Sequence, residues 1–415
     1  MRLALGKIYG YIKNTFVIFL FAWISFFPQP LQDRYFIYAR IFLGVFLGVL
    51  LLNKDCRKVM FSIRDWPLWA FLLCLSLNII KASDKKVALG TYFYLAGTLG
   101  LLFYIGKGMY HFKKDVSMVS AVVCALSILV SLLAVFEMLF AFDPLYQGFI
   151  NNEFYQRYIT GWVRPMSTLY NPAPLGTYLL FTLPFAAYLV KKKAGIGRVL
   201  GAAALILNSF CLIATFSRAA FLGLLSMPLC FFLIKKRYKA FFVILSLIIL
   251  FVIILSLLPY PINRLGPKGI GIYGTGLFSG YRIVRAKMSL EMFKASPLTG
   301  VGLNHFRILF DQYYPAKQYL AGVPYEIKIP DNMWLSLFCE TGIVGMVGFL
   351  VFIVSLFKGA FKKAGIFIIP SLSLIGLLFN MAGYELLYWA SPYMLFCLAC
   401  GFIQGAAITK SECQS

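Results

Sequence analysis

Three arginines of this 415-residue chain stand where they could bind a phosphorylated group. Arg164 precedes an Asn-Pro pair, Arg218 begins an apolar segment, and Arg282 lies in a segment with helical spacing. A guanidinium group keeps its proton in proteins and can contact two phosphate oxygens at once. An arginine beside an apolar segment can also extend toward a membrane interface without binding a ligand. The arginines therefore predict either an anion site suited to a diphosphate or a set of interfacial anchors.

An Asp-Asn pair supplies a second kind of chemistry. Asp331 and Asn332 lie directly before an apolar segment that starts at Met333. An Asp or Asn at such a position commonly caps a helix, whereas a carboxylate beside a hydroxyl group can take its proton as a general base. Both interpretations of Asp331 stay open from the residues alone, and Asn332 is a candidate for substrate binding.

Other polar residues belong to the same part of the chain. His305 follows a Gly-Val-Gly turn and is a candidate for substrate binding, with catalysis as the alternative. Arg285 falls on the same predicted polar helix face as Arg282 and is another substrate-binding candidate. Glu340 and Glu137 lie inside apolar segments, so we expect both to be buried structural carboxylates with internal partners.

The nine cysteines do not form a disulfide or metal-binding pattern. Most lie inside apolar segments, and the Cys397-x-x-Cys400 pair has no partner pair. The segments predicted to lie outside the cytoplasm carry no carboxylate-rich metal motif. We therefore expect the protein to use neither a metal ion nor another cofactor.

The composition places these residues in a membrane protein. Hydrophobic residues make up 61% of the chain and charged residues 13%, and the mean hydropathy is +0.81. A soluble domain carries about 25% charged residues, so the composition excludes a soluble enzyme, a disordered chain and a secreted disulfide scaffold. The net charge of +24 would favour a nucleic-acid partner in a soluble protein, but basic residues also collect in the cytoplasmic loops of membrane proteins.

About twelve apolar segments predict membrane-spanning helices, since a span needs about 20 residues. They cover 15–28, 35–52, 66–80, 87–106, 116–141, 172–190, 198–215, 219–234, 240–258, 333–357, 365–382 and 387–406. With the N-terminus in the cytoplasm, most of the 39 Lys and Arg residues fall on the cytoplasmic side, as the positive-inside rule requires. We predict an all-α polytopic membrane protein with both termini cytoplasmic and no nucleic-acid partner.

Two outer segments interrupt the series of spans and divide the chain. The predicted parts are 1–141 with the first five helices, 142–258 with an outer loop and four helices, 259–332 as an extracytoplasmic catalytic loop, and 333–415 with the last three helices. Long loops of this kind usually carry function. The site is therefore expected outside the cytoplasm.

The long outer loop contains two recognisable stretches. Its glycine-rich start, 265–280, includes a literal Gly-x-Gly-x-x-Gly, which we interpret as a flexible loop because no strand-turn-helix unit surrounds it. The following segment, 281–295, has Tyr281, Val284, Met288 and Met292 on one apolar face. This spacing predicts an amphipathic helix that lies along the membrane surface or covers a cavity.

Taken together, these motifs resemble the membrane glycosyltransferase superfamily of O-antigen ligases and O-antigen polymerases. Four segments carry the resemblance in order: Arg164-Pro-Met-Ser-Thr-Leu-Tyr-Asn171-Pro172, Ser217-Arg218, Arg282 with Pro297-Leu-Thr-Gly-Val-Gly302, and Asp331-Asn332 with Glu340-Thr-Gly342-Ile-Val-Gly345. The resemblance implies that Arg218 and Arg282 hold a diphosphate and that Asp331 is the base. Ligases of the family commonly have His-Asn where this chain has Asp-Asn, so the choice between ligase and polymerase stays open.

The resemblance also implies the substrates and the compartment. The donor would be a glycan on undecaprenyl diphosphate, at the periplasmic face of the bacterial inner membrane. The acceptor would be a sugar hydroxyl, on lipid A–core for a ligase or on a second lipid-linked glycan for a polymerase. Transfer would invert the anomeric centre without a metal, and Arg164 would position the donor. A transporter and a lipid-glycan flippase are the rival hypotheses, although a transporter more often shows two matching halves.

Overall fold

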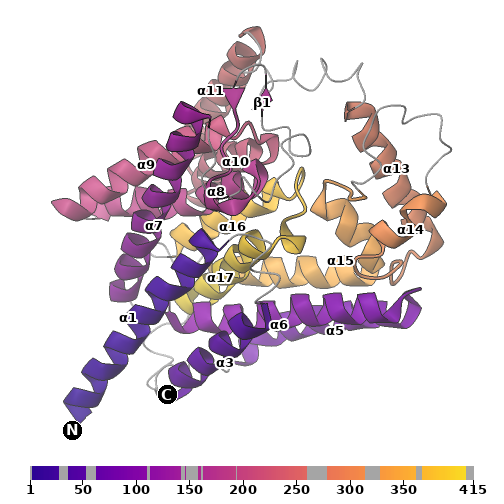
Figure 1. Ribbon diagram of the computed structural model, residues 1–415, viewed down its shortest axis with the longest axis horizontal. Coiled ribbons are helices and arrows are strands. Elements are labelled where there is room, and N and C mark those ends of the chain that lie inside the picture. Colours follow the sequence, from indigo (N-terminus) through magenta and orange to yellow (C-terminus); the bar gives the residue numbers. More distant parts are fainter. Residues whose placement is uncertain are drawn as a thin grey trace.

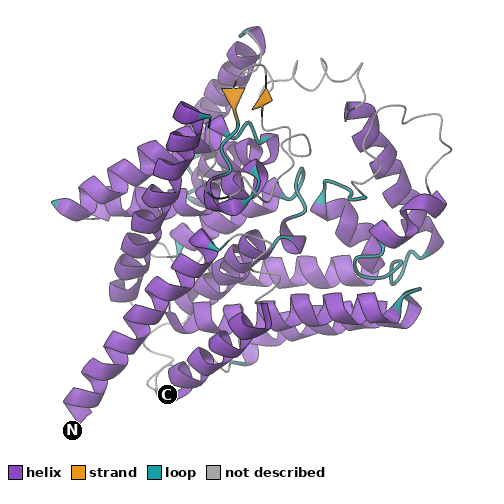
Figure 2. Ribbon diagram, in the orientation of Figure 1, coloured by secondary structure: helices purple, strands orange, loops and turns teal. Residues whose placement is uncertain are grey.

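The computed structural model of the protein describes residues 2–27, 36–52, 62–109, 113–141, 145, 158–159, 162–192, 194–258, 278–313, 328–360 and 367–407. These residues form a helical bundle, as Figures 1 and 2 show. The exception is a small antiparallel hairpin of β1 (Tyr158–Ile159) and β2 (Trp162–Val163). The glycine-rich stretch around Gly269–Gly274 lies outside the described residues.

Each predicted apolar segment coincides with a helix. The helices are α1 (Arg2–Phe26), α3 (Phe36–Leu52), α5 (Trp66–Lys81), α6 (Lys85–Met109), α7 (Lys113–Phe140), α8 (Pro172–Lys192), α9 (Ile196–Ala214), α10 (Arg218–Ile234), α11 (Tyr238–Leu257), α15 (Met333–Ala360), α16 (Ile368–Asn380) and α17 (Ala390–Ala407). The outer loop adds α13 (Phe278–Ala295) and α14 (Phe306–Tyr313). The all-α prediction is therefore confirmed.

The helices differ in whether their length suits a membrane crossing. In the described part of the chain, seven are long and apolar enough to cross a membrane, namely α6, α7, α8, α9, α11, α15 and α17, and four shorter apolar helices accompany them. For the described residues, helix length and composition therefore support seven of the twelve predicted spans. Shorter helices can cross only where neighbouring protein covers their ends, because an uncovered backbone cannot stay in lipid.

The centre of the bundle is α17, which is buried along nearly its whole length. It packs against α6 through glycines: a Cβ atom added at Gly401 or Gly405 would overlap the α6 backbone at Phe103 or Lys107. Small residues at a helix contact let two backbones approach closely, which is how membrane helices gain packing energy. This contact fixes the core around which the other helices are arranged.

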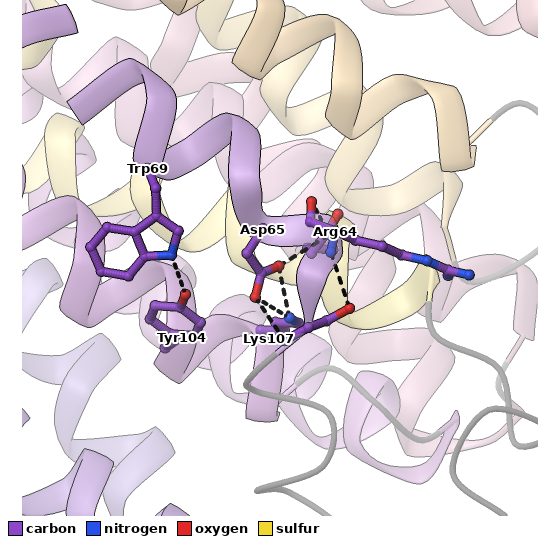
Figure 3. A network of polar contacts seen from close by, with 7 residues as sticks. Arg64, Asp65, Trp69, Tyr104 and Lys107 are labelled. Carbon is purple, nitrogen blue, oxygen red and sulfur yellow. Dashed lines mark hydrogen bonds and ion pairs between the residues drawn. The ribbon is translucent and has the colours of Figure 1, made fainter. Parts of the chain in front are cut away.

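A buried ion pair ties three helices together at one end of the bundle (Figure 3). Lys107 Nζ lies 2.8 Å and 2.7 Å from the two carboxylate oxygens of Asp65, and both side chains are at most 2% exposed. Gln404 of α17 donates to the same carboxylate at 3.2 Å. The start of α5 and the ends of α6 and α17 therefore meet at this point.

The opposite ends of these helices meet several loops. The Asp84 backbone N–H donates to His305 at 3.0 Å, and the Asn304 N–H donates to the Tyr388 hydroxyl at 3.3 Å. The Asn332 side chain donates to the Ala382 carbonyl at 2.9 Å. All of these loops are ones that the topology prediction places outside the cytoplasm, so their mutual contact is what that topology requires.

Helix α15 is broken at Gly342, where φ is 62°. The turn before α14 fills the break: Ile343 and Val344 donate to the Pro297 and Leu298 carbonyls, and Val301 donates to the Cys339 carbonyl. The combination of this φ with a ψ of −165° is one that only glycine adopts readily. The two glycine motifs at 300–302 and 342–345 thus interlock, and they attach the outer loop to a membrane helix.

Candidate functional site

In the Asp-Asn pair, the helix cap that the sequence left open for Asp331 is formed by Asn332. The Asn332 side-chain oxygen accepts from the backbone N–H groups of Trp334 and Leu335 at 3.0 and 3.2 Å, so Asn332 is the cap of α15. Asp331 lies before the helix with φ at 55° and keeps a side chain that is 32% exposed. A carboxylate that is not occupied by capping is available for chemistry.

Arg285 of α13 forms an ion pair with Asp331 through Nη1 and Oδ2. The arginine is only 1% exposed, and Ser289, one turn further on, is fully buried with its hydroxyl on the Arg285 carbonyl. The predicted polar face of this helix is therefore turned into the protein at Arg285. A buried guanidinium fixes the direction in which the Asp331 carboxylate points.

The apolar face of α13 packs on protein. Met288 and Met292 are buried against Phe306 and Phe310 of α14 and Cys339 of α15. Of the two predicted positions for this helix, these contacts support the one in which its apolar face covers other parts of the protein. Figure 1 shows α13 beside α14 and α15, at the side of the bundle.

Arg218 and Arg164 come together at the turn between α9 and α10. Arg218 is the first residue of α10 and is partly buried, behind the Ser217 cap. Arg164 Nε donates to the Thr215 carbonyl in the same turn at 2.9 Å. Glu137 holds the chain beyond Arg164 by accepting from the Met166 N–H at 2.8 Å, as expected of a buried carboxylate with an internal partner.

The glycine at 383 brings this turn close to the loop between α16 and α17. A Cβ atom added at Gly383 would lie 3.1 Å from the Cβ of Ala219, the residue after Arg218. The same loop accepts the hydrogen bond from Asn332 at Ala382. The α16–α17 loop therefore lies between the Arg218 turn and the Asp331 turn and joins them into one region.

Arg282 is placed differently from the other arginines. It is exposed on α13, one turn before the buried Arg285. Helix α13 packs on α14 and α15, whereas α10, which carries Arg218, packs on α8, α11 and α16. A ligand that used both arginines would therefore have to lie between these two groups of helices.

His305 has a structural arrangement. The side chain is fully buried, its Nδ1 lies 2.9 Å from the Leu303 carbonyl, and its Nε2 accepts from the Asp84 N–H at 3.0 Å. These contacts specify the neutral ring with the proton on Nδ1. With both nitrogens in contact with backbone groups, His305 connects the α5–α6 loop to the outer loop.

Glu340 and Glu385 are two buried carboxyl groups behind Asp331. Glu340 accepts from the Phe306 N–H at 3.1 Å and from the Tyr388 hydroxyl, so it has the internal partners expected of it. Glu385 lies in the α16–α17 loop, is 3% exposed and accepts from the Ser336 hydroxyl at 3.1 Å. The sequence analysis missed Glu385, although an acidic residue between two apolar segments was a usable signal.

Burial and neighbouring charge act on Glu385 in the same direction. Desolvation, followed by the negative charges of Asp331 and Glu340, raises the pKa of the Glu385 carboxyl to about 8. Within the described residues, no group of three or more His, Cys, Asp or Glu side chains could hold a metal ion. The charged side chains described above for the candidate site are arginines and carboxyl groups.

The comparison with protein families bears on this arrangement. Residues 203–350 match the family model described as O-Antigen ligase. This segment is similar to the O-antigen ligase family. It includes Arg218, Arg282, Arg285 and Asp331, whereas Arg164 and Glu385 lie outside it. No curated protein matches the chain.

The family match confirms the resemblance that the motifs indicated. It implies a glycosyltransferase-like activity in O-antigen assembly, with a lipid-linked glycan and an acceptor as partners. The apolar helices agree with the multi-pass membrane protein that such a family requires.

Proposed function

We propose that this protein is a membrane glycosyltransferase of the O-antigen ligase type, which moves a glycan from undecaprenyl diphosphate to a sugar hydroxyl. The observation that carries the proposal is the position of Asp331. It is a partly exposed carboxylate, relieved of capping by Asn332 and oriented by Arg285, within the region that also contains Arg218. The family domain at 203–350 supports the same class of reaction.

The chemistry follows from the charges of these groups. Asp331 takes the proton of the acceptor hydroxyl as its oxygen forms the new bond to the anomeric carbon. The bond from that carbon to the diphosphate breaks, and undecaprenyl diphosphate leaves with the electron pair. Arg218 and Arg282 stabilise the negative charge that grows on the diphosphate, and Arg164 positions the donor. Attack from the side opposite the leaving group inverts the anomeric centre.

The arginines also explain why we propose a metal-independent reaction. Guanidinium groups are permanently charged and contact phosphate oxygens in pairs, so they supply the positive charge that a divalent cation would otherwise give. Two or three arginines supply two or three positive charges, which suit the negative charge of a diphosphate.

Sidedness is part of the proposal. The site faces the periplasm of a bacterial inner membrane, and the ends of α6 and α17 near Lys107 and Gln404 face the cytoplasm. The contacts between the loops at 82–84, 304–305, 331–332 and 381–388 support a common side for them. The basic residues support that side being the outer one.

A polymerase is the second candidate function. It is favoured by the Asp331-Asn332 pair, because ligases of the resembling family commonly have His-Asn there. A polymerase would use the same donor and the same base, and only the acceptor would differ: a ligase takes lipid A–core, which we place first, and a polymerase takes a second lipid-linked glycan.

One experiment tests both candidates. Purified protein in lipid nanodiscs, with a chelator present, is given lipid-linked glycan plus lipid A–core in one tube and lipid-linked glycan alone in another. A ligase transfers glycan only in the first tube, and a polymerase lengthens the donor glycan in the second. A protein that leaves the donor unchanged in both tubes, with and without added divalent cation, is not the proposed enzyme.

A further inference from the structure

Three of the 15 acidic residues of the chain gather around the first turns of α15. Asp331 is at the surface of the region, and Glu340 and Glu385 are buried behind it at 2% and 3% exposure. Several negative charges cannot share such a volume cheaply, because the cost of burying a charge rises with each unpaired carboxylate. The proposed mechanism requires a negative charge on Asp331 alone, and Glu340 and Glu385 can each be charged or neutral.

Among the described residues, Glu340 has more hydrogen-bond donors than Glu385. Glu340 accepts from a backbone N–H and from the Tyr388 hydroxyl. The hydrogen bond recorded for Glu385 comes from Ser336, whose hydroxyl also lies 3.1 Å from the Asn332 carbonyl. A buried carboxyl group with few hydrogen-bond donors is stabilised by keeping its proton.

The backbone holds Glu385 close to the catalytic turn. The Met333 N–H donates to the Met381 carbonyl at 2.9 Å, and the Asn332 side chain donates to the Ala382 carbonyl. These bonds attach the loop that carries Glu385 to the two residues that follow Asp331. A charge on Glu385 would therefore act directly on the charge of Asp331.

We propose that Glu385 is a positioning residue for Asp331, which must hold a proton so that Asp331 carries the only negative charge of the pair. The neutral Glu385 leaves the Asp331 carboxylate paired with Arg285 and directed at the acceptor. Ionised Glu385 repels that carboxylate. This inference rests on the proposed function of Asp331 as the base.

The charged and titratable groups around Glu385 agree with a proton near neutral pH. Asp331 and Glu340 raise the pKa of Glu385, and Arg307 of α14 and the Ser336 hydroxyl lower it, with burial as the largest effect. Tyr384 and Tyr388 of the same loop and Cys339 of α15 complete the group; Arg285 of α13 acts on Asp331. With the pKa at about 8, Glu385 loses its proton at mildly alkaline pH.

The first test is the pH profile of transfer by the wild-type protein and Glu385→Gln. An amide resembles the protonated acid and cannot ionise, so the variant should be active at pH 7. At pH 9 the wild type should fall to about a tenth of its rate at pH 7, as expected for one ionisation near pH 8, and Glu385→Gln should keep more than half of its own rate. An equal alkaline decline in both proteins overturns the proposal.

Two further variants make the test independent of one substitution. Ser336→Ala removes a hydrogen bond that favours the ionised form, so its alkaline decline should move to higher pH; an unmoved or lowered midpoint contradicts the proposal. Glu291→Gln, which changes an exposed carboxylate of α13, should leave the whole profile unchanged. A shift of the same size in Glu291→Gln also overturns the assignment to Glu385.

Melting temperature separates this inference from the proposed function. A raised folded-state pKa means that stability is fully present below the unfolded pKa of about 4.5 and is lost as pH rises toward 8. The advantage of Glu385→Gln over wild type should therefore grow between pH 4.5 and 8, even if no glycan is transferred. A constant difference in melting temperature across this range contradicts the proposed proton on Glu385. If the wild-type protein transfers no glycan while this difference grows as expected, only the proposed function is contradicted.

Discussion

At Asp331 the backbone itself marks the residue as unusual. A φ of 55° is a left-handed conformation that Asp and Asn adopt more readily than most residues. Because Asn332 performs the capping, an aspartate is not needed at 331 for the helix to start. Replacement of Asp331 by Asn therefore keeps the cap of α15, and it leaves a polar side chain beside the buried Arg285.

We predict that Asp331→Asn is well expressed but transfers glycan about 10²–10⁴-fold more slowly, because an amide cannot take a proton. Asp331→His should keep partial activity, with a pH profile moved toward the higher pKa of imidazole. The measurement is the initial rate of transfer by purified protein. Asp311→Asn is the matched control, since it also removes a carboxylate with a basic partner, Lys328, and should keep the wild-type rate. A wild-type rate in Asp331→Asn would remove Asp331 from the mechanism.

Arg218 offers a second test on a single residue. Arg218→Ala should nearly abolish transfer, and Arg218→Lys should restore little, because an ammonium group does not reproduce the two-pronged contact with a diphosphate. Arg282→Ala should have the same effect if the donor lies between α10 and α13. Arg198→Ala, at the far end of α9, is the control and should be active. Full activity of Arg218→Ala at normal membrane levels would leave it an interfacial anchor.

Among the elements, broken helix α15 decides how the outer loop is attached. Its interruption at Gly342 frees backbone groups that the 297–302 turn then uses. Backbone that is not helical is tolerated at membrane depth only where protein covers it. The interlock therefore positions α13, and with it Arg285, relative to Asp331.

We predict that Gly342→Ala destabilises the protein and also lowers transfer. The left-handed backbone alone costs a side chain about 1–2 kcal/mol, and a Cβ atom would lie 2.5 Å from the Leu298 carbonyl oxygen. Gly90→Ala on α6 is the control, because a Cβ there meets nothing within 4 Å. The check is melting temperature in detergent together with transfer rate. An unchanged Gly342→Ala protein would mean that the interlock does not hold the loop.

For the whole molecule, the buried Asp65–Lys107 pair is a constraint that is costly to break by removing one partner. Removing one partner leaves an uncompensated charge, which costs about 3–5 kcal/mol in buried pairs. We predict a large loss of thermal stability in Lys107→Met. The double variant Asp65→Leu/Lys107→Met should recover much of it. Lys294→Met, which breaks an exposed pair, should change little. A double variant less stable than Lys107→Met would contradict this account.

Sidedness is the second property of the whole molecule. Leu298 is 63% exposed in the turn that enters the α15 break, and Lys239 is exposed at the start of α11. We predict that a membrane-impermeant thiol reagent labels Leu298→Cys in intact spheroplasts and labels Lys239→Cys only after lysis. The chain without the added cysteine is the control for its native thiols. The reverse pattern would place the site in the cytoplasm and remove the periplasmic donor.

The sequence by itself determined the class of protein and the position of its helices. Each apolar segment is a local signal, since about 20 hydrophobic residues form a helix in lipid whatever lies elsewhere in the chain. The motif residues at 218, 282 and 331 could also be found from the sequence, because family motifs are short local sequences. One helix of the outer loop, α13, was predicted from the spacing that includes Met288 and Met292, whereas α14 was not.

Only the tertiary structure decided which residues meet. Asp331 and Asn332 are equal candidates for a cap in the sequence, and the φ at 331 with the N–H groups of Trp334 and Leu335 distinguishes them. Arg285 lies 46 positions from Asp331 and Glu385 lies 49 positions from Ser336, and both contacts depend on how helices pack across the bundle. Hydrophobic periodicity describes a helix face but not its partner, because the partner is chosen by long-range packing that no local pattern contains.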